Sequence, residues 1–487
     1  MTHLDITDWL VIVLYLGGII ALGMWFGRGQ HNTRDYFLGS RNTSWWAIGF
    51  SIVAAETSAL TVIGIPGLAF GGDIAFLQMI VGYVLARVLL AVVLVPHYFK
   101  GEIYSPYQLL ADRFGSSARR TAGGFFLLSE TLGAGVRVYV VAIPIQLMLG
   151  MPVLPAVILF VVLSLVYTYV GGVKAVIWTD AVQFVLFLAG GLYTLFYLPG
   201  LVTGGWDGMW AQALEAGKLH VFNPEFTWGQ PYNIWMGLIG GTVMVMSSHG
   251  AEQLIVQRVL TCGSVGDGRK ALILSAVLIL PLFLIFLLVG AFLWVYYQQQ
   301  PIAIPLPEAR PGIKANDFIY PIFMLTEVPH VLRGFLIVAI LAAAMSSVSS
   351  ALTALASVST MDFLKPLLPG RSESQYLRIS RHTTLFWGVL LIGVAYLCRQ
   401  VTVVLDAAFS LRGLTSGALL GGVIMAVFLR RGSPWPVVVG MLSALGVMLW
   451  VQTSTTVFWP WYTLIGCSVC LLVTLGLRRV WRSAGKG

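Results

Sequence analysis

The chain has 487 residues, of which 58% are hydrophobic and only 10% are charged, and its formal net charge is +9. Soluble globular domains typically have about 25% charged residues, so the composition excludes that class. A chain with a mean hydropathy of +0.85 belongs in a lipid bilayer.

Apolar segments of spanning length, about 17–25 residues for a helix, recur along the whole chain. We therefore expect an all-α polytopic membrane protein with about 13 transmembrane helices and a single domain over residues 1–487. The segments lie near residues 8–27, 46–66, 76–98, 122–149, 153–172, 176–203, 232–260, 271–298, 332–364, 381–399, 401–430, 433–453 and 459–477.

The distribution of cationic residues predicts the orientation of these spans. An odd number of spans puts the termini on opposite sides, and Lys and Arg concentrate in cytoplasmic loops. With the N-terminus outside, the inner loops collect 21 of the 29 Lys and Arg residues. We expect an inner-membrane protein with a periplasmic or extracellular N-terminus and a cytoplasmic C-terminus. The net positive charge then reflects topology, and no nucleic-acid partner is expected.

Two spans carry polar interruptions near their middles, AlaAlaGluThrSer at 54–58 and SerSerHisGly at 247–250. A helix broken at membrane depth is tolerated where its freed backbone lines a cavity or meets protein, and matching breaks in two halves indicate a binding site. We expect a peripheral helix at 8–27, a first five-helix repeat at 46–203, an inverted second repeat at 232–430, and two C-terminal helices at 433–477.

Four serines interrupt the apolar run 334–364. At about 100° per residue, Ser346, Ser349 and Ser350 share one helix face, and Ser347 lies beside it. Such an oxygen-lined stripe suits a dehydrated Na+, which needs several oxygen ligands. In the alternative interpretation, these hydroxyls bond back to carbonyls one turn earlier or allow close helix packing.

Five segments together resemble the sodium/solute symporter family, which includes sialic acid, proline, galactose and iodide symporters. The resemblance covers nearly the whole chain and implies a LeuT-type core of five plus five inverted-repeat helices. The segments are SerIleValAlaAlaGluThrSer at 51–58, TyrThrTyrValGlyGlyValLysAlaValIleTrpThrAsp at 167–180, GluGlnLeuIleValGlnArgValLeu at 252–260, AlaAlaAlaMetSerSerValSerSerAlaLeu at 342–352 and ThrMetAspPhe at 360–363.

The resemblance implies one or two sites for the coupling ion Na+. The first would join oxygens of the broken first repeat helix to those of the serine helix, at Ala54, Thr57, Ala343, Ser346 and Ser347. A second, present in some members, would use Asp180 with Ser346, Ser349 and Ser350. Because Asp180 follows Trp178 near the inner end of its helix, a hydrated carboxylate at the membrane interface is the alternative.

Charged residues inside the spans bear on the solute. Glu56, Arg87, Arg137 and Arg412 would each be costly in the bilayer unless paired or facing water, so we expect Glu56 to meet one arginine. One carboxylate and three guanidiniums leave a cationic excess. Arg137, or else Arg412, would then bind an anionic group of the solute, since guanidinium matches carboxylate bidentately. A structural ion pair of Glu56 with Arg137 is the alternative.

Further pocket candidates are chosen from depth and neighbourhood: Ser58, Thr61, Gln78, His249 and Gln253. His249 is either a solute contact or a structural donor. Where galactose symporters place an inner-gate tyrosine, this chain has Ser248, so a neutral hexose is not the first expectation.

The expected function is Na+-coupled import of a small polar solute bearing a carboxylate, such as an acidic sugar like sialic acid, by alternating access. The alternatives are a monocarboxylate, an amino acid or a neutral sugar as solute, or coupling to protons on the same scaffold. Partners are the solute, Na+ and membrane lipid, with no obligatory subunit. No enzyme activity is expected, since no span carries clustered nucleophiles or metal ligands.

Overall fold

The structure is a computed structural model. It describes residues 4–101, 103–229, 232–306, 315–398, 402–429 and 431–484, and their side chains except at 59–60, 140–141, 143–148, 315, 317, 398, 402–412 and 481–484. Within these ranges the chain is helical and contains no strand.

The first half of the chain forms ten α-helices with two short 3-10 turns, η1 (Gly39–Arg41) and η2 (Leu198–Leu201). The helices are α1 (Ile6–Phe26), α2 (Thr33–Leu38), α3 (Trp45–Glu56), α4 (Ala59–Gly71), α5 (Leu77–Val93), α6 (Val95–Tyr98), α7 (Tyr107–Phe114), α8 (Ser116–Leu149), α9 (Val153–Tyr197) and α10 (Gly205–Glu215).

The second half forms another ten, with π-helical turns η3 (Met236–Gly241) and η5 (Ser359–Leu364) and 3-10 turns η4 (Ala315–Phe318) and η6 (Trp459–Trp461). The helices are α11 (Thr242–Gly250), α12 (Gln253–Leu260), α13 (Val265–Gln299), α14 (Ile319–Thr326), α15 (Leu332–Val358), α16 (Lys365–Leu367), α17 (Glu373–Cys398), α18 (Thr402–Phe428), α19 (Trp435–Ser454) and α20 (Tyr462–Ala484).

Among the described residues, six helical segments are long and apolar enough to cross a membrane, or seven if the bent pair α3 and α4 forms one span. Helix α5 and the last part of α18 are shorter apolar helices. The chain is therefore a multi-pass membrane protein, and the count of 13 spans stays a prediction.

Helix α9 covers two of the predicted spans and is bent between them at Gly172, where φ is 56° and ψ is −150°. This left-handed backbone favours glycine. A Cβ there would also lie 2.3 Å from the Tyr36 carbonyl oxygen, so α2 can approach α9 only because residue 172 has no side chain.

Both predicted helix breaks are present. Helix α3 ends at Glu56 and α4 begins at Ala59, with a bend of 56° between the axes. Helix α11 ends at Gly250, and α12 begins at Gln253. The backbone groups freed at these two breaks lie inside the helical bundle.

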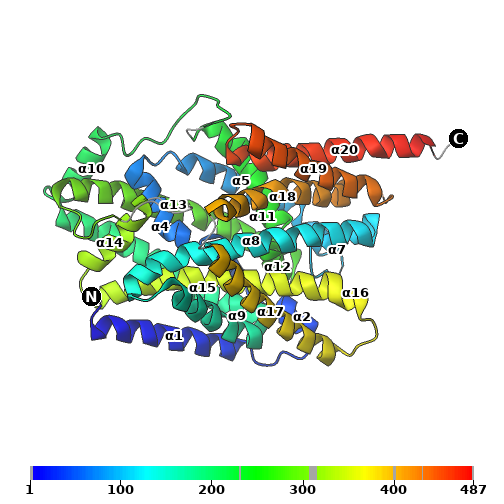
Figure 1. Cartoon of the computed structure of the whole chain (residues 1–487), viewed down its shortest axis with the longest axis horizontal. Coiled ribbons are helices and arrows are strands. Elements are labelled where there is room, and N and C mark those ends of the chain that lie inside the picture. Colours follow the sequence, from blue (N-terminus) through cyan, green and yellow to red (C-terminus); the bar gives the residue numbers. More distant parts are fainter. Residues whose placement is uncertain are drawn as a thin grey trace.

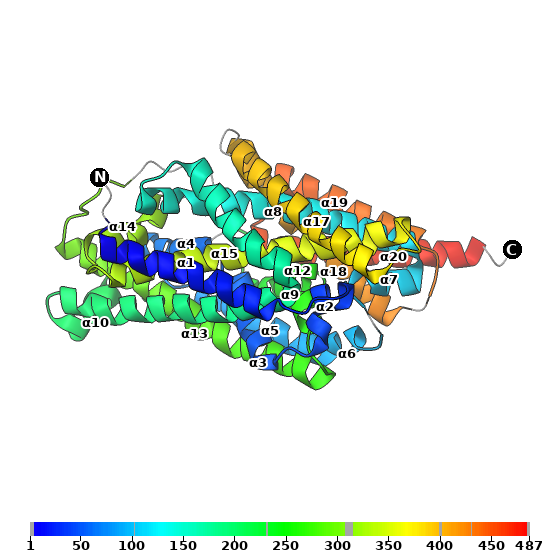
Figure 2. The same ribbon diagram turned by 90° about the horizontal axis from the view of Figure 1, so that it is seen from below.

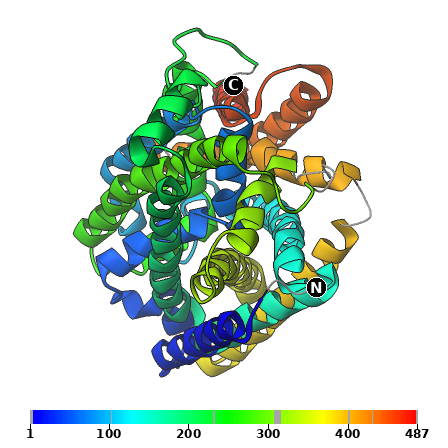
Figure 3. The same ribbon diagram turned by 90° about the vertical axis from the view of Figure 1, so that its left-hand side faces the viewer.

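The long helices run roughly along the longest axis of the molecule (Figure 1). Helix α15 lies inside the bundle, since 94% of its most apolar 18-residue stretch is buried. For α1 the corresponding share is only 17%. Helix α1 runs along one surface (Figure 2), and the C-terminal α20 lies at another edge when the bundle is seen end on (Figure 3).

Candidate functional site

A cavity of about 560 Å³ lies between the two helix breaks. Its walls come from helices far apart in the sequence: α3, α5, α8, the α11 to α12 break, α18 and α20. The lining residues are Ala55, Glu56, Tyr83, Arg137, Met244, Val245, Ser248, His249, Glu252, Leu254, Ile255, Gly413, Ser416, Trp459, Tyr462 and Thr463. A pocket of this size and mixed lining is typical of small-molecule sites.

Glu56, at the end of α3, forms an ion pair with the fully buried Arg87 of α5. His249 joins them, with its Nε2 3.1 Å from Arg87 Nη2 and 3.6 Å from Glu56 Oε2, while its Nδ1 lies 2.9 Å from Ser248 Oγ. Arg87 also donates to the Tyr83 carbonyl at 3.0 Å and to Ser275 Oγ at 3.1 Å. The expectation that Glu56 meets an arginine is confirmed.

Arg137 pairs with Glu130, seven residues earlier on the same face of α8, and its Nε donates to the Gly133 carbonyl at 3.2 Å. The alternative ion pair of Glu56 with Arg137 is therefore wrong, since each residue has another partner. The expected cationic excess is also wrong for Arg87 and Arg137, because Glu56 and Glu130 balance them. The side chain of Arg412 lies outside the described residues.

Arg137 faces two spaces. Besides the cavity, it lines a small crevice together with Ser58 and the serine-helix residue Ser347. One guanidinium thus stands between the cavity and the predicted first Na+ site.

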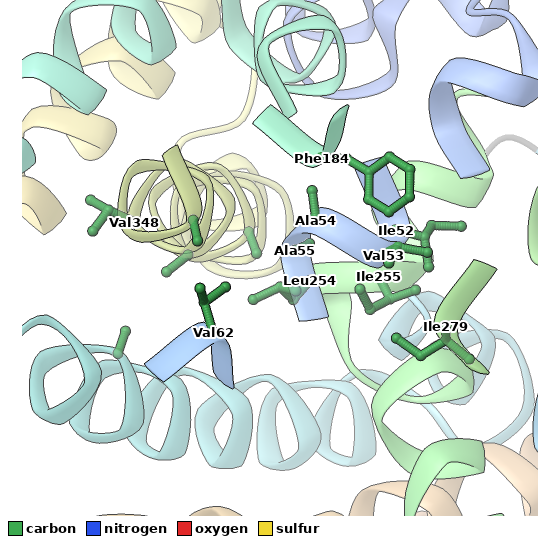
Figure 4. Close-up of a cluster of buried hydrophobic side chains, with 14 of the residues drawn as sticks. Ile52, Val53, Ala54, Ala55, Val62, Phe184, Leu254, Ile255, Ile279 and Val348 are labelled. Carbon is green, nitrogen blue, oxygen red and sulfur yellow. The ribbon is translucent and has the colours of Figure 1, made fainter. Parts of the chain in front are cut away.

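The residues predicted for the first Na+ site lie at the α3 to α4 break and on α15, and Ser58 of the break and Ser347 of α15 line the same small crevice. At the end of α3 the Thr57 N–H donates to the Val53 carbonyl, and at the start of α4 the Thr61 N–H donates to the Ser58 carbonyl. The backbone carbonyls between Val53 and Ser58 therefore lie where the helical hydrogen-bond pattern is interrupted. Figure 4 shows Ala54 and Ala55 beside α15.

Two hydroxyls of the predicted site, one at the break and one on α15, suit a cation. The buried Thr57 Oγ1 has no hydrogen-bond partner within the described part of the chain. The Ser347 hydroxyl donates back to the Ala343 carbonyl at 3.1 Å. A hydroxyl that donates its proton still has lone pairs for a cation. The donor set therefore fits Na+, whose ligation by Ala54, Thr57, Ala343, Ser346 and Ser347 stays a prediction.

Asp180 is fully buried on α9, so the alternative of a hydrated carboxylate at the membrane interface is wrong. Its Oδ1 accepts from Ser346 Oγ at 2.8 Å, and its Oδ2 accepts from Ser51 Oγ at 2.7 Å and from Arg258 Nη2 at 2.9 Å. Arg258 also donates to Ser350. We call Asp180, Ser51, Arg258, Ser346 and Ser350 the Asp180 cluster.

The Asp180 cluster changes the expectation for a second Na+. Arg258, on α12, is 2% exposed and already neutralises Asp180. Ser349 and Ser350 donate back to the Ser346 carbonyl, as in the alternative interpretation of the serine stripe. A second Na+ beside Asp180 would have to share the carboxylate with Arg258.

The remaining pocket candidates lie outside the cavity lining. Ser58 caps α4 and lies 3.4 Å from the Thr61 hydroxyl. The side-chain Oε1 of Gln78 accepts from the Asn223 backbone N–H at 3.0 Å. The Gln253 amide donates to the Tyr104 carbonyl and to Ser357, which ties α12 to its neighbours. Their role in solute binding stays a prediction.

Sequence reasoning missed several residues of the site. Glu130 was detectable, because a carboxylate seven residues from Arg137 falls on the same helix face. Glu252 stands at the second break and lines the cavity. Nothing in the local sequence indicated that Trp459, Tyr462 and Thr463 would reach it.

Two broken helices beside a cavity of mixed lining, with hydroxyl and carbonyl oxygens at one break, are typical of a secondary transporter. Residues 36–443 match the family model described as "Sodium:solute symporter family". The chain belongs to this family of Na+-coupled transporters and is not an enzyme. The recognition made from the five motifs is confirmed.

Similar proteins agree with this assignment. The chain is 29% identical to the sodium/sialic acid symporter NanT of Aliivibrio fischeri, covering 96% of this chain and 92% of that one. It is 28% identical to the sodium/sialic acid symporter SiaT of Proteus mirabilis, covering 94% and 92%. Na+ as the coupling ion is thus supported by family and relatives alike.

Two solved structures show the fold. A Na+-coupled sialic acid symporter in a substrate-bound outward-open state superposes with a TM-score of 0.87 at 26% identity, covering 96% of this chain and 97% of that one. Mhp1, a nucleobase-cation-symport-1 family transporter in a closed conformation, superposes with a TM-score of 0.60 at 14% identity, covering 93% and 95%. The fold is that of these transporters.

Proposed function

We propose that the chain imports a small carboxylate-bearing solute, such as an acidic sugar of the sialic acid type, together with Na+. The observation that carries the proposal is the position of Arg137, which faces the cavity on one side and a crevice shared with Ser347 on the other. Glu130 and the Gly133 carbonyl orient the guanidinium, and such a group binds a carboxylate bidentately.

The position of Arg137 also provides a physical link between Na+ binding and solute binding. Na+ held by the α3 to α4 break and the α15 serines would fix α4 and α15 relative to each other. That arrangement would keep Arg137 in place for the solute carboxylate, so each ligand would bind more tightly in the presence of the other. Loss of Na+ on the inner side would then favour solute release.

The proposed topology has 13 spans, with residues 46–203 and 232–430 as inverted repeats and α1, α19 and α20 outside them. The breaks at the α3 to α4 and α11 to α12 junctions support it, since they lie in the first helix of each proposed repeat. We place the N-terminus outside and the C-terminus in the cytoplasm of an inner-membrane protein, because the positive charges of the loops favour this orientation.

The test is thermal stabilisation and uptake by the purified protein with sialic acid, in NaCl and in matched choline chloride. We expect stabilisation by sialic acid only with Na+, and uptake that needs an inward Na+ gradient at fixed pH. Arg137→Lys should lower uptake at least tenfold, because ammonium cannot form the bidentate contact. Arg378→Lys, at an exposed arginine of α17, serves as the control. Normal uptake by Arg137→Lys and Arg137→Ala would exclude the carboxylate contact.

A further inference from the structure

The C-terminal helix α20 follows the proposed ten-helix core in sequence, yet it reaches the cavity. Trp459, Tyr462 and Thr463, at the start of this helix and in the turn before it, are three of the lining residues. The Trp459 side chain is 37% exposed, whereas Tyr462 and Thr463 are largely buried. We call these three residues the α20 wall.

Glycines explain how α20 comes so close. A Cβ at Gly417 of α18 would lie 2.5 Å from the Cys467 nitrogen and 2.7 Å from the Thr463 carbonyl oxygen. A Cβ at Gly421 would lie 2.9 Å from Cys470 Cβ. Helix α20 therefore packs backbone to backbone against α18, as small residues permit in membrane helices.

At Gly413, one turn earlier on α18, the contact opens. Gly413 lines the cavity, and a Cβ there would lie 3.5 Å from Tyr462 Cδ2, which is ordinary van der Waals contact. Because residue 413 has no side chain, part of the Tyr462 ring borders the cavity. Gly417 and Gly421 thus allow α20 to approach α18, and Gly413 leaves part of the Tyr462 ring uncovered toward the cavity.

Hydrogen bonds connect the α20 wall to the second helix break. The hydroxyl groups of Thr463 and Ser416 lie 2.9 Å apart, and the Ser416 carbonyl accepts from Ser247 Oγ at 2.7 Å. Ser247 lies on α11 four residues before the break. Thr463 is consequently held in a fixed position relative to the core helices that form the opposite walls.

The chemistry of the α20 wall differs from that of the core walls. Glu56 and Arg137 carry charge and His249 an imidazole, whereas Trp459 and Tyr462 carry aromatic rings and Thr463 a hydroxyl. Aromatic rings with polar edges bind surfaces that are apolar on one side and hydroxylated on another. The geometry points to the α20 wall as a determinant of solute specificity, which contacts the hydroxylated ring or chain that the solute carries besides its carboxylate.

This inference rests on the proposed function for the carboxylate, and it narrows the solute class. A cavity of about 560 Å³ with its aromatic wall on a helix outside the core accommodates an acidic sugar better than a two- or three-carbon acid. The α20 wall would contribute to the binding of such a solute and little to that of a small monocarboxylate.

The experiment compares Na+-dependent binding and uptake of sialic acid, pyruvate, proline and galactose by wild-type protein in liposomes. The variants are then measured with whichever of these solutes binds.

Tyr462→Ala should raise KM at least tenfold, with kcat within about twofold. Gly413→Ala, which fits sterically, should raise KM by narrowing the cavity. Thr463→Val should raise KM about threefold or more, and Thr463→Ser should restore it. Leu472→Ala is the control, because Leu472 is 72% exposed on α20.

The outcomes separate the two proposals. Unchanged KM in both Tyr462→Ala and Gly413→Ala would overturn the role of the α20 wall and leave the proposed function intact. Na+-dependent binding of proline or galactose in place of the acids would overturn the proposed solute class, and the same variants would still test the wall. If Tyr462→Ala does not fold, Gly413→Ala and the Thr463 pair decide. Binding of none of the four solutes would overturn both proposals.

Discussion

The Asp180 cluster and the solute cavity both hold charged groups inside the bundle, but they satisfy them differently. In the Asp180 cluster both carboxylate oxygens accept hydrogen bonds, and Asp180 and Arg258 are at most 2% exposed. In the cavity, Arg87 is fully buried but Glu56 keeps 16% of its side chain exposed, and Arg137 keeps 13%. The first arrangement is closed, whereas the second keeps one member of each ion pair accessible to a solute.

The largest loss of stability should follow from removing the ion pair of Asp180 with Arg258. Arg258→Met removes the partner of Asp180 and leaves a buried charge unpaired, which typically costs roughly 3–5 kcal/mol. We expect a strongly lowered melting temperature in detergent. The double variant Asp180→Asn/Arg258→Met removes both charges and should recover most of the loss. A single variant as stable as the wild type would show that water reaches Asp180.

Breaking the ion pair of Glu56 with Arg87 should lower the free energy of unfolding by a smaller amount. Glu56→Gln leaves Arg87 with its bonds to the Tyr83 carbonyl and to Ser275, so we expect a loss of roughly 2 kcal/mol, the size of one hydrogen bond to a charged group. The same melting assay measures it. A loss as large as that of Arg258→Met would remove the distinction between the two regions.

The predicted first Na+ site lies between the two regions and should respond to a smaller change. Ser347→Ala removes one hydroxyl ligand, for which we expect about 1 kcal/mol, or roughly a fivefold higher Na+ concentration for half-maximal stabilisation. The control is Thr353→Val, because Thr353 also donates back to a carbonyl on α15 but lies outside both predicted sites. Equal shifts in both variants would argue against Na+ ligation by Ser347.

The smallest effect should come from an exposed carboxylate. Burial alone would raise the pKa of Glu373, but hydrogen bonds from Thr33 and Lys365 lower it below its usual range. Its stabilising contribution is therefore present above the unfolded-state pKa and lost as the pH falls through the folded-state pKa. Because Glu373 is half exposed, Glu373→Gln should cost less than about 1 kcal/mol near pH 7 and still less at a pH below the folded-state pKa. Melting curves at the two pH values measure the difference.

The helix breaks were predictable from sequence, because polar residues at membrane depth rarely lie in an unbroken lipid-facing helix. The ion-pair partner of a charged residue was predictable only where both residues lie on the same helix. The pairing of Glu130 with Arg137 lies within one helix and follows from its periodicity, whereas the choice of Arg87 as the partner of Glu56 depends on how α3 and α5 both pack against α13. Similarly, Arg258 and Asp180 are 78 residues apart in the sequence, and only the fold brings them together.

The sequence by itself determined that this protein is a membrane transporter, where its two helices break, and to which family it belongs. These features depend on local composition and on the need to satisfy backbone groups in lipid. Only the tertiary structure decided that Arg258 neutralises Asp180, that Arg137 faces both cavity and crevice, and that α20 contributes a wall to the cavity. Those arrangements depend on the rotation and close approach of helices distant in sequence, which the local sequence leaves open.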